Sequence, residues 1–253
     1  MISGKVYSQI KEGVAWITFS HPQSNSMPGL LLRQLANEIS EAGKNPEAKV
    51  IIVQSEGEKV FCAGASFDEM AALKNQDEAN HFFEGFSLVI NAMRRSPKFI
   101  IARIQGKAAG GGVGIACAAD YTLALQSASV KLSELAIGIG PFAVGPAVAR
   151  KIGPAAFTEL AINATEWRDA AWAKQKGMYA EVFPTTEELD KAVFALASRL
   201  AQSNPDAMRE LKKVIWEGTE HWDKLLIERS AISARLALGE FTKKAIAKFK
   251  AGN

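Results

Sequence analysis

The sequence predicts an α/β fold that becomes helical in its last third. Short apolar runs typical of buried strands, such as residues 49–53 and 121–125, alternate with longer segments of helical periodicity, such as 29–43 and 77–95. After Pro154 the pattern is almost entirely helical. Strands that alternate with helices in this way usually form a parallel sheet with right-handed crossovers.

The chain opens with a predicted hairpin and a helix. Apolar and polar residues alternate over 5–10 and 14–19, on either side of a turn at Glu12-Gly13, which is the pattern of two paired strands. The following helix has apolar residues at 32, 35, 39 and 42, a 3-4-3 spacing that forms one helical face. Pro28 suits its first turn.

The middle of the chain twice runs from a strand into small residues and then into a helix. Residues 60–66 end in Ala-Gly-Ala-Ser, and the Ser66-x-x-Glu69 spacing fits a helix capping box. A strand over 98–105 leads into a stretch with glycines at 106, 110, 111, 112 and 114. Such junctions bring backbone N–H groups close to other groups.

The remaining elements are assigned by the same criteria. We expect short strands at 121–125, 129–132 and 178–183, an irregular loop at 133–141, and helices at 154–163, 166–176, 186–201, 204–217, 220–237 and 240–249. We predict a core over 1–195 and a C-terminal helical region over 196–253, which must pack on the core or on another subunit.

Composition excludes several classes of protein. The 253 residues carry a net charge of +3, too small to indicate nucleic-acid binding. The two cysteines do not form a disulfide framework, and the three histidines lack metal-ligand spacing. No apolar run reaches the ~18 residues that a membrane helix needs. We therefore expect a cytoplasmic protein without a metal site.

The run Gly110-Gly111-Gly112 has three possible explanations. If this junction lies beside the one at Ala63-Gly64-Ala65, one N–H from each can converge on a single oxygen and form an oxyanion hole. The glycines can also permit close packing, or they can bind another anion. The phosphate-binding pattern G-x-x-x-x-G-K-[ST] and the dinucleotide pattern G-x-G-x-x-G are absent.

Glu134 is the one carboxylate in the apolar loop 133–141. Burial raises the pKa of a carboxyl group and brings it toward the range that is useful for proton transfer. An exposed carboxylate, or one paired with a lysine such as Lys131, is the alternative, and the residue type alone leaves both open.

Four segments resemble the enoyl-CoA hydratase/isomerase family, the crotonase superfamily. They are HPQSNSM (21–27), FCAGASFDEM (61–70), QGKAAGGGVGIACAAD (105–120) and SELAIGIGP (133–141). They follow the family's order and spacing, and the resemblance covers essentially the whole chain. It implies a spiral of ββα units with a C-terminal helical region, a homo-trimer or hexamer, and an acyl-CoA thioester substrate with no separate cofactor.

The resemblance also implies the site residues. Ala65 and Gly111 would donate the two oxyanion N–H groups, and Glu134 would carry the proton. Substrate and CoA contacts are implied at Ala63, Gly64, Phe67, Gly110, Gly114, Pro141, Phe142 and, near the CoA phosphate, Lys248.

The departures from the family pattern bear on the reaction. Family hydratases hold a water between two glutamates, but this chain has Gly114 at one of the two positions. The single Glu134 suffices to move a proton along a substrate, so we expect isomerisation of a 3-enoyl-CoA to a 2-enoyl-CoA. A hydratase, a decarboxylase of an unsaturated acyl-CoA and a non-catalytic CoA-binding protein are the alternatives.

Two further positions differ from the family pattern, and two others could compensate for the missing carboxylate. Ser66 replaces the aspartate of the family's A-G-A-D segment, and we expect an effect on capping only. Phe142 stands where a glycine is common and is expected to reshape the acyl pocket. His81 and Glu84 could substitute for the missing acid, although a surface location is the better expectation. We also expect that Gly114→Glu would introduce or raise hydration of a 2-enoyl-CoA if the pocket otherwise has hydratase geometry.

Overall fold

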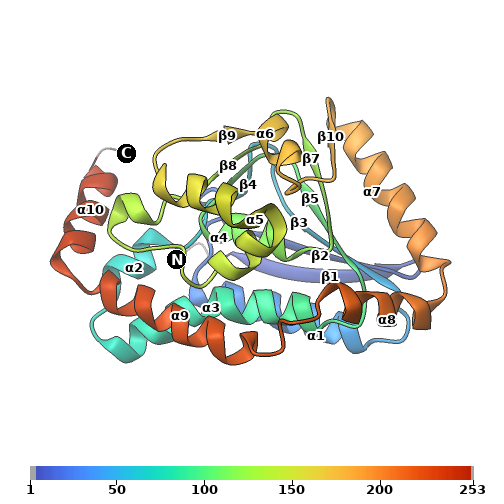
Figure 1. Ribbon diagram of the computed structural model, residues 1–253, viewed down its shortest axis with the longest axis horizontal. Helices are drawn as coiled ribbons and strands as arrows, with labels where there is room; N and C mark the ends of the chain where they lie inside the picture. Colours follow the sequence, from blue (N-terminus) through green and yellow to red (C-terminus); the bar gives the residue numbers. More distant parts are fainter. Residues whose placement is uncertain (1–3, 252–253) are drawn as a thin grey trace.

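A computed structural model describes residues 4–251. Two sheets form the centre of the molecule, and helices cover them (Figure 1). The first half comprises β1 (Lys5–Lys11), β2 (Val14–Ser20), α1 (Gly29–Lys44), β3 (Val50–Ser55), β4 (Val60–Cys62), α2 (Phe67–Ala72), α3 (Gln76–Arg95), β5 (Ile100–Ile104), β6 (Lys107–Ala109) and α4 (Gly111–Ala118). The second half comprises β7 (Tyr121–Leu125), β8 (Ser129–Lys131), the 3₁₀ turn η1 (Leu135–Ile137), α5 (Gly145–Ile162), β9 (Arg168–Asp169), α6 (Ala170–Gln175), β10 (Glu181–Phe183), α7 (Thr186–Ala201), α8 (Pro205–Ile215), α9 (Trp222–Ala237) and α10 (Glu240–Ala251).

The larger sheet has six strands in the order β1-β2-β3-β5-β7-β10. The predicted hairpin is confirmed: β1 and β2 pair antiparallel around a tight turn, with Lys11 opposite Val14. All later neighbours in this sheet are parallel. Strands β3 and β5 are buried almost throughout, as expected for parallel strands that are covered on both faces.

The smaller sheet has the order β4-β6-β8-β9 and determines the geometry of the site. Strands β4 and β6 are parallel, with Cys62 opposite Ala108. Both therefore end at the same edge of the sheet, where the chain enters α2 and α4. Strand β8 lies parallel to β6 on its other side, and Ala109 is opposite Lys131. The start of the loop that carries Glu134 thus lies beside the glycine-rich junction.

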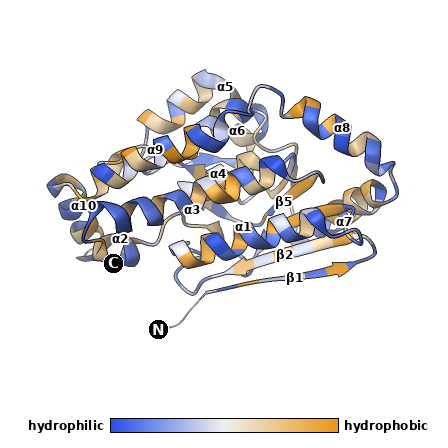
Figure 2. Ribbon diagram, turned by 90° about the horizontal axis from the view of Figure 1, so that it is seen from below, coloured by the Kyte–Doolittle hydropathy of each residue, from blue (hydrophilic) through white to orange (hydrophobic). Residues whose placement is uncertain are grey.

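Helices bury the two faces of the larger sheet. The apolar side chains of α1 and α3 join the main core, which includes Leu32, Leu35 and Ile90. The opposite face is covered by α7, where Leu189 and Val193 pack against β3, β5 and β7. Hydrophilic residues line the outward sides of α1 and α3 in Figure 2, as the periodicity predicted.

The C-terminal helices extend along the whole molecule. Helix α9 packs along α3, and Ser87 of α3 donates a 2.9 Å hydrogen bond to the carbonyl of Leu226. Figure 1 shows α7 and α8 at one end of the molecule and α10 at the other. There α10 contacts α2 and η1, so the last helix reaches both segments that flank the site.

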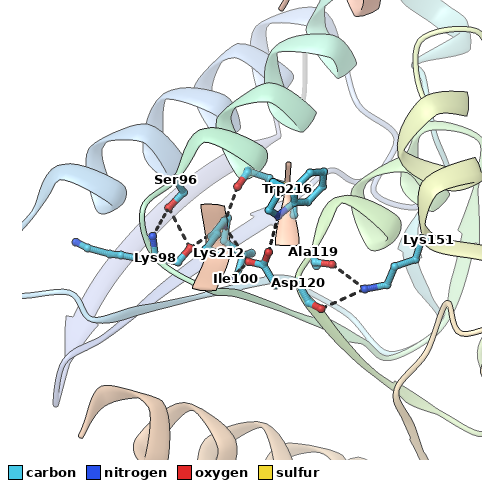
Figure 3. Close-up of polar contacts among 9 residues, drawn as sticks. Ser96, Lys98, Ile100, Ala119, Asp120, Lys151, Lys212 and Trp216 are labelled. Atoms are coloured by element: carbon cyan, nitrogen blue, oxygen red, sulfur yellow. Dashed lines mark hydrogen bonds and ion pairs between the residues drawn. The ribbon is translucent and has the colours of Figure 1, made fainter. Parts of the chain in front are cut away.

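The C-terminal end of α4 is held by a buried polar cluster (Figure 3). The carboxylate of Asp120 accepts hydrogen bonds from Ile100 N (2.7 Å), Trp216 Nε1 (2.7 Å) and Lys212 Nζ (2.9 Å). Lys151 Nζ donates to the carbonyls of Ala119 and Asp120. The side chains of Lys212 and Asp120 are 3% and 5% exposed. A pair buried this deeply couples α8 to the core.

The predicted elements differ from the structure at four places. Strands β6 and β9, of three and two residues, were not predicted. Helix α5 begins at Gly145 rather than 154, since it contains a break at Gly153, where φ is 79°. Helix α6 begins at Ala170 rather than 166. The predicted boundary at residue 195 falls within α7, and the division into two regions stays a prediction.

Candidate active site

Two strand–helix junctions lie side by side at the edge of the smaller sheet. A Cβ atom built on Gly64 would lie 3.0 Å from the carbonyl oxygen of Ala109 and 3.5 Å from the backbone N of Gly111. The Met27 N–H donates to the Gly64 carbonyl at 2.8 Å and fixes the first junction. The sequence placed these junctions 46 residues apart, from Ala65 to Gly111, and the parallel pairing of β4 with β6 brings them together.

Each junction leaves one backbone N–H without an acceptor. Within residues 4–251, neither the Ala65 N–H nor the Gly111 N–H donates a hydrogen bond to another protein group. Gly111 is the first residue of α4, and the first N–H groups of a helix have no partner within it. Both residues line the same pocket. This pair of donors is the arrangement that stabilises a negative oxygen.

Gly110 allows the carboxylate to approach this pair. Its φ is 51° and its ψ is −118°, a conformation that side-chain-bearing residues rarely adopt. A Cβ on Gly110 would lie 3.1 Å from Glu134 Oε1. The Gly110 N–H also donates to the Lys131 carbonyl at 2.8 Å, which ties the junction to the end of β8. Glycine at position 110 therefore permits both this backbone conformation and the close approach of the Glu134 carboxylate.

Gly111 and Gly112 are required by packing as well. A Cβ on Gly111 would lie 2.1 Å from the ring of Phe86, and one on Gly112 would lie 2.6 Å from the Cys62 carbonyl oxygen. The packing explanation for the glycine run is therefore confirmed, and it coexists with the free N–H. Through these contacts with Phe86 and Cys62, α4 packs closely against α3 and β4.

Glu134 is held with its carboxyl group away from water. Its Oε2 is buried and has no hydrogen-bond partner within the described residues, although the residue as a whole is partly exposed. Burial raises the pKa of the Glu134 carboxyl to about 7. The alternative of an ion pair with Lys131 is wrong, because no such pair occurs within residues 4–251. A carboxyl group with this pKa can accept and return a proton near neutral pH.

The carboxyl group faces a small, mostly apolar pocket of about 50 Å³. Within the described chain, Glu134 is its only titratable lining residue. The polar lining side chains besides Glu134 are Ser133 and Ser233, and Ser233 donates to the Gly140 carbonyl at 3.3 Å. The other lining residues are Ala63, Gly64, Ala65, Phe67, Met70, Phe83, Phe86, Gly110, Gly111, Ile137, Ile139, Gly140, Pro141, Phe142, Ala143 and Val144.

The position of the missing carboxylate is occupied by packed apolar atoms. Gly114 is buried inside α4 and does not line the pocket. A Cβ on Gly114 would lie 2.5 Å from Val144 Cγ1 and 3.6 Å from Ile90 Cδ1. The expectation that Gly114→Glu alone restores hydration is therefore corrected: the glutamate side chain has no room there.

The candidates outside the motif lie away from the pocket. His81 contacts Arg33 of α1 at about 3 Å, and Glu84 lies 3.9 Å from the same guanidinium group. Neither residue lines the small pocket. Ser66 accepts a hydrogen bond from the Glu69 N–H at 3.3 Å, so it caps α2 as expected.

A larger groove of about 780 Å³ lies next to the small pocket. Ala63, Ala65 and Phe67 line both spaces. The rings of Phe67 and Phe249 meet edge to face, with centroids 4.8 Å apart, so α10 forms one wall of the groove. The groove is larger than the pocket and has charged lining side chains, among them Lys107, Lys131 and Lys250, which suits a ligand with a small reacting end and a large polar handle.

Lys248 does not line the groove; its neighbour Lys250 does. The Lys250 ammonium lies 2.6 Å from the Asp68 carboxylate, so its charge is already paired. The role predicted for Lys248 stays untested, but sequence reasoning missed Lys250. The lysine-rich composition of residues 243–250 was the available signal.

The described residues hold neither a candidate metal site nor a membrane-spanning helix. Residues 4–251 contain no group of three or more His, Cys, Asp or Glu side chains that could hold a metal ion. Across the same range, no helix combines the length and the hydropathy needed to cross a bilayer. Cys62 and Cys117 are buried and unpaired, and burial raises the pKa of each thiol to about 12.

Two unpartnered N–H groups, one of them at the N-terminus of α4, line one pocket together with a buried carboxyl group, an arrangement of the kind that enzymes use to stabilise a negatively charged oxygen and to move a proton. The chain belongs to the enoyl-CoA hydratase/isomerase family, whose model matches residues 9–248. It is a crotonase-family enzyme that acts on an acyl-CoA.

Named relatives and a solved structure agree with this assignment. The chain is 33% identical over 78% of its length to methylglutaconyl-CoA hydratase of Rattus norvegicus, and it spans 63% of that relative. It is 28% identical to 2,3-dehydroadipyl-CoA hydratase of Escherichia coli, over 83% of this chain and 81% of that one. An enoyl-CoA hydratase structure from Bacillus halodurans has a TM-score of 0.88 at 21% identity, covering 96% of this chain and 99% of that chain.

The structural match confirms the predicted fold: two mixed sheets with C-terminal helices in the crotonase arrangement. The names of the two relatives favour the hydratase alternative over the isomerase that the sequence led us to expect.

Proposed function

We propose that this enzyme moves the double bond of an enoyl-CoA from the 3-position to the 2-position through a thioester enolate. The supporting observation is that Glu134 is the only titratable side chain, within the described residues, that lines the pocket beside the two free N–H groups. Isomerisation needs one group that removes a proton and returns it elsewhere. Hydration needs a water held in place as well.

The oxyanion donors act on the thioester carbonyl. Removal of a proton from C2 places negative charge on the thioester oxygen, which accepts hydrogen bonds from the N–H groups of Ala65 and Gly111. The N-terminal end of α4 adds its partial positive charge at the same point. Each donor of this kind typically contributes about 10²–10³ in rate.

Glu134 carries the proton. Its carboxylate takes a proton from C2 and delivers it to C4, while the double bond moves from C3–C4 to C2–C3; no atom is gained or lost. With a pKa of about 7, the group is partly ionised at neutral pH and can act in both directions. The apolar lining from Phe86, Phe142 and Val144 limits the access of water to the enolate.

Hydration is the second candidate. The relatives in rat and Escherichia coli are named hydratases, and Ser133 and Ser233 supply hydroxyl groups that could hold a water in the pocket. Against it stands the filled space at Gly114, where Val144 leaves no room for a second carboxylate. Decarboxylation of an unsaturated acyl-CoA would use the same enolate site and is the third candidate.

A panel of CoA thioesters, analysed by mass spectrometry after incubation with the enzyme, tests the proposal. Isomerisation leaves the mass of a 3-enoyl-CoA unchanged and produces the conjugated product. Hydration adds one water, and decarboxylation removes carbon dioxide. Addition of water to a 2-enoyl-CoA, with no isomerisation of the 3-enoyl-CoA, would replace the first candidate by the second.

The proposal includes assembly as a homo-trimer or hexamer. Large apolar side chains stand exposed on α7 and α8: Phe194 is 47% exposed, Leu211 53% and Val214 66%. Neighbouring exposed apolar groups of this size commonly mark an interface. Light scattering coupled to size-exclusion chromatography should give a mass three or six times that of the chain; a monomer would contradict it.

A further inference from the structure

The small pocket has an entrance and a far wall. Residues that line both the pocket and the larger groove lie between the two spaces and form the entrance: Ala63, Ala65, Phe67, Ser133 and Ile137. The large apolar side chains that line the pocket alone form the far wall: Met70, Phe83, Phe86, Ile139, Phe142 and Val144. An acyl chain that extends past the two free N–H groups therefore meets the far wall.

Most of the far wall is backed by the protein interior. Phe83 and Phe86 are each 6% exposed, and Val144 is 4% exposed, so no space lies behind them. The pocket in front of them measures about 50 Å³. One water-sized group needs roughly 10–15 Å³ of such space, which leaves room for about four groups of this size. A longer chain can extend only where the wall borders the exterior.

Phe142 is the side chain of the far wall that borders the exterior. It is partly exposed, whereas the other five members of the wall are buried. Its ring lies against Gly140, where a Cβ atom would come within 2.6 Å of the ring atoms Cε2 and Cζ. The Phe142 N–H donates to the Gly140 carbonyl at 2.7 Å, and Ser233 of α9 donates to the same carbonyl at 3.3 Å. This tight turn holds the ring across the end of the pocket.

The pocket offers no cation to a second charge on the acyl chain. Within residues 4–251, its only titratable lining group is Glu134, and burial already raises the pKa of that carboxyl to about 7. A carboxylate at the end of an acyl chain would lie among apolar side chains and near a second carboxyl group. Desolvation and repulsion between like charges both oppose this placement.

We propose that this enzyme selects short, uncharged acyl chains of about four to six carbon atoms, and that the Phe142 ring sets the upper limit because it closes the pocket toward the exterior. This inference rests on the proposed function, since it takes the acyl end of the thioester to lie beside Glu134. It adds the substrate class, which membership of the family leaves open.

Binding of saturated acyl-CoA thioesters tests the size and charge of the pocket without any reaction. Each buried methylene group should strengthen binding about fourfold, so the Kd measured by calorimetry should fall from acetyl-CoA to butyryl-CoA. Decanoyl-CoA should bind at least about tenfold more weakly than hexanoyl-CoA, because its extra methylene groups displace packed side chains. Glutaryl-CoA should bind at least about tenfold more weakly than pentanoyl-CoA, which has the same chain length without the second carboxylate.

Phe142→Ala tests the upper limit. Removal of the ring opens the pocket toward the exterior, so the ratio of kcat/KM for dec-3-enoyl-CoA to that for hex-3-enoyl-CoA should rise at least about tenfold. The Kd of decanoyl-CoA should fall by a similar factor. Val144→Ala enlarges the pocket on its closed side instead, and should change the same ratio by less than about threefold.

Phe183→Ala is the matched control. Phe183 of β10 is also partly exposed, but it packs on the opposite face of the larger sheet and lines neither space. Its ratio should stay within about twofold of the wild type. Circular dichroism verifies folding, and Phe142→Leu, with a smaller rise in the same direction, serves if Phe142→Ala is unstable.

The outcomes separate the chain-length limit from the reaction. Equal isomerisation of the six-carbon and ten-carbon substrates by the wild type, or an unchanged ratio in folded Phe142→Ala, overturns this inference and leaves the proposed function standing. Binding of saturated thioesters that depends on chain length as predicted, without turnover of any 3-enoyl-CoA, overturns the proposed reaction and retains the limit. Equal affinity for all chain lengths, together with no turnover, overturns both.

Discussion

At its N-terminal end, helix α4 presents the Gly111 N–H and, beside it, Oε2 of Glu134, neither of which has a hydrogen-bond partner within residues 4–251. At its C-terminal end, Lys151 donates to two carbonyls, and Asp120 accepts from three donors, among them Lys212. The two ends belong to one helix of eight residues. The polar groups at the N-terminal end thus lack hydrogen-bond partners in the described structure, whereas those at the C-terminal end have them.

This difference shows how a strained site is kept in a stable protein. A buried carboxyl group without a partner costs free energy, and the surrounding structure must offset that cost. The buried Asp120–Lys212 pair, which joins α8 to the end of α4, supplies rigidity where no chemistry is needed. Changes at the N-terminal end should therefore alter rate, and changes at the C-terminal end should alter stability.

The largest effect is expected for Glu134→Gln. The amide has almost the shape of the carboxyl group but cannot accept the proton, so kcat should fall about 10³–10⁴-fold, with the affinity for CoA nearly unchanged. Steady-state kinetics and calorimetry measure the two quantities.

Glu84→Gln is the matched control, because Glu84 lies outside the pocket beside Arg33. Its kcat should stay within about twofold of the wild type. Full activity of Glu134→Gln, or a loss in Glu84→Gln as large as the one expected at Glu134, would contradict the assignment of the proton carrier.

Lys212→Met tests the opposite end of α4. The change leaves the buried Asp120 charge without its cation and should lower the free energy of unfolding by roughly 3–5 kcal/mol. Urea denaturation measures this loss. The kcat of the folded fraction should stay within about threefold of the wild type. A normal stability, or a kcat that falls as it does in Glu134→Gln, would show that the N-terminal end of α4 does not govern the rate while the C-terminal end governs the stability.

The pH dependence of the protein's stability tests the N-terminal end of α4 in a second way. The pKa of Glu134 is raised from 4.5 to about 7 in the folded state. The free energy that the buried Glu134 charge subtracts from the stability of the fold is therefore zero below pH 4.5, grows as the pH rises, and is complete above pH 7. Glu134→Gln should therefore be more stable than the wild type at pH 8, by at most about 3 kcal/mol. This advantage should shrink at pH 5.

Thermal unfolding at the two pH values provides the measurement. Over the same interval, kcat/KM of the wild type should rise as Glu134 ionises. A stability difference that is equal at pH 5 and pH 8 would mean that the Glu134 carboxyl titrates at its ordinary pKa.

The smallest effect is expected for the second carboxylate position. Gly114→Glu alone should destabilise the protein without giving hydratase activity, because Val144 occupies the space. The double variant Gly114→Glu/Val144→Ala makes room and should give measurable hydration of a 2-enoyl-CoA. Val144→Ala alone is the control. Hydration by the Gly114→Glu single variant would show that Val144 does not fill this space in solution.

Long elements with clear periodicity could be predicted from the sequence, and short ones could not. Helix α7 and strand β7 match the expected 186–201 and 121–125, since their apolar patterns extend over several turns or a whole buried strand. Strand β9 has two residues and no pattern of its own. The start of α5 was missed because Pro154 was interpreted as a helix beginning, whereas Gly153 with its positive φ breaks a helix already formed.

The site could be predicted to the level of motifs. Ala65, Gly111 and Glu134 were named from their segments, and all three line one pocket. The packing of Val144 on Gly114 depends on contacts between segments 30 residues apart, which no local pattern records. Likewise, the pattern of α10 did not decide whether Lys248 or Lys250 faces the groove, although residues two apart on a helix point about 200° apart and therefore to nearly opposite sides.

The central claim is that one carboxylate moves a proton between two carbons of the same substrate. Incubation of a 3-enoyl-CoA deuterated at C2, followed by NMR of the product, tests it most directly. We predict the conjugated 2-enoyl-CoA with part of the deuterium transferred to C4. Absence of the conjugated product, together with formation of the 3-hydroxyacyl-CoA from a 2-enoyl-CoA, would contradict the account and establish hydration instead.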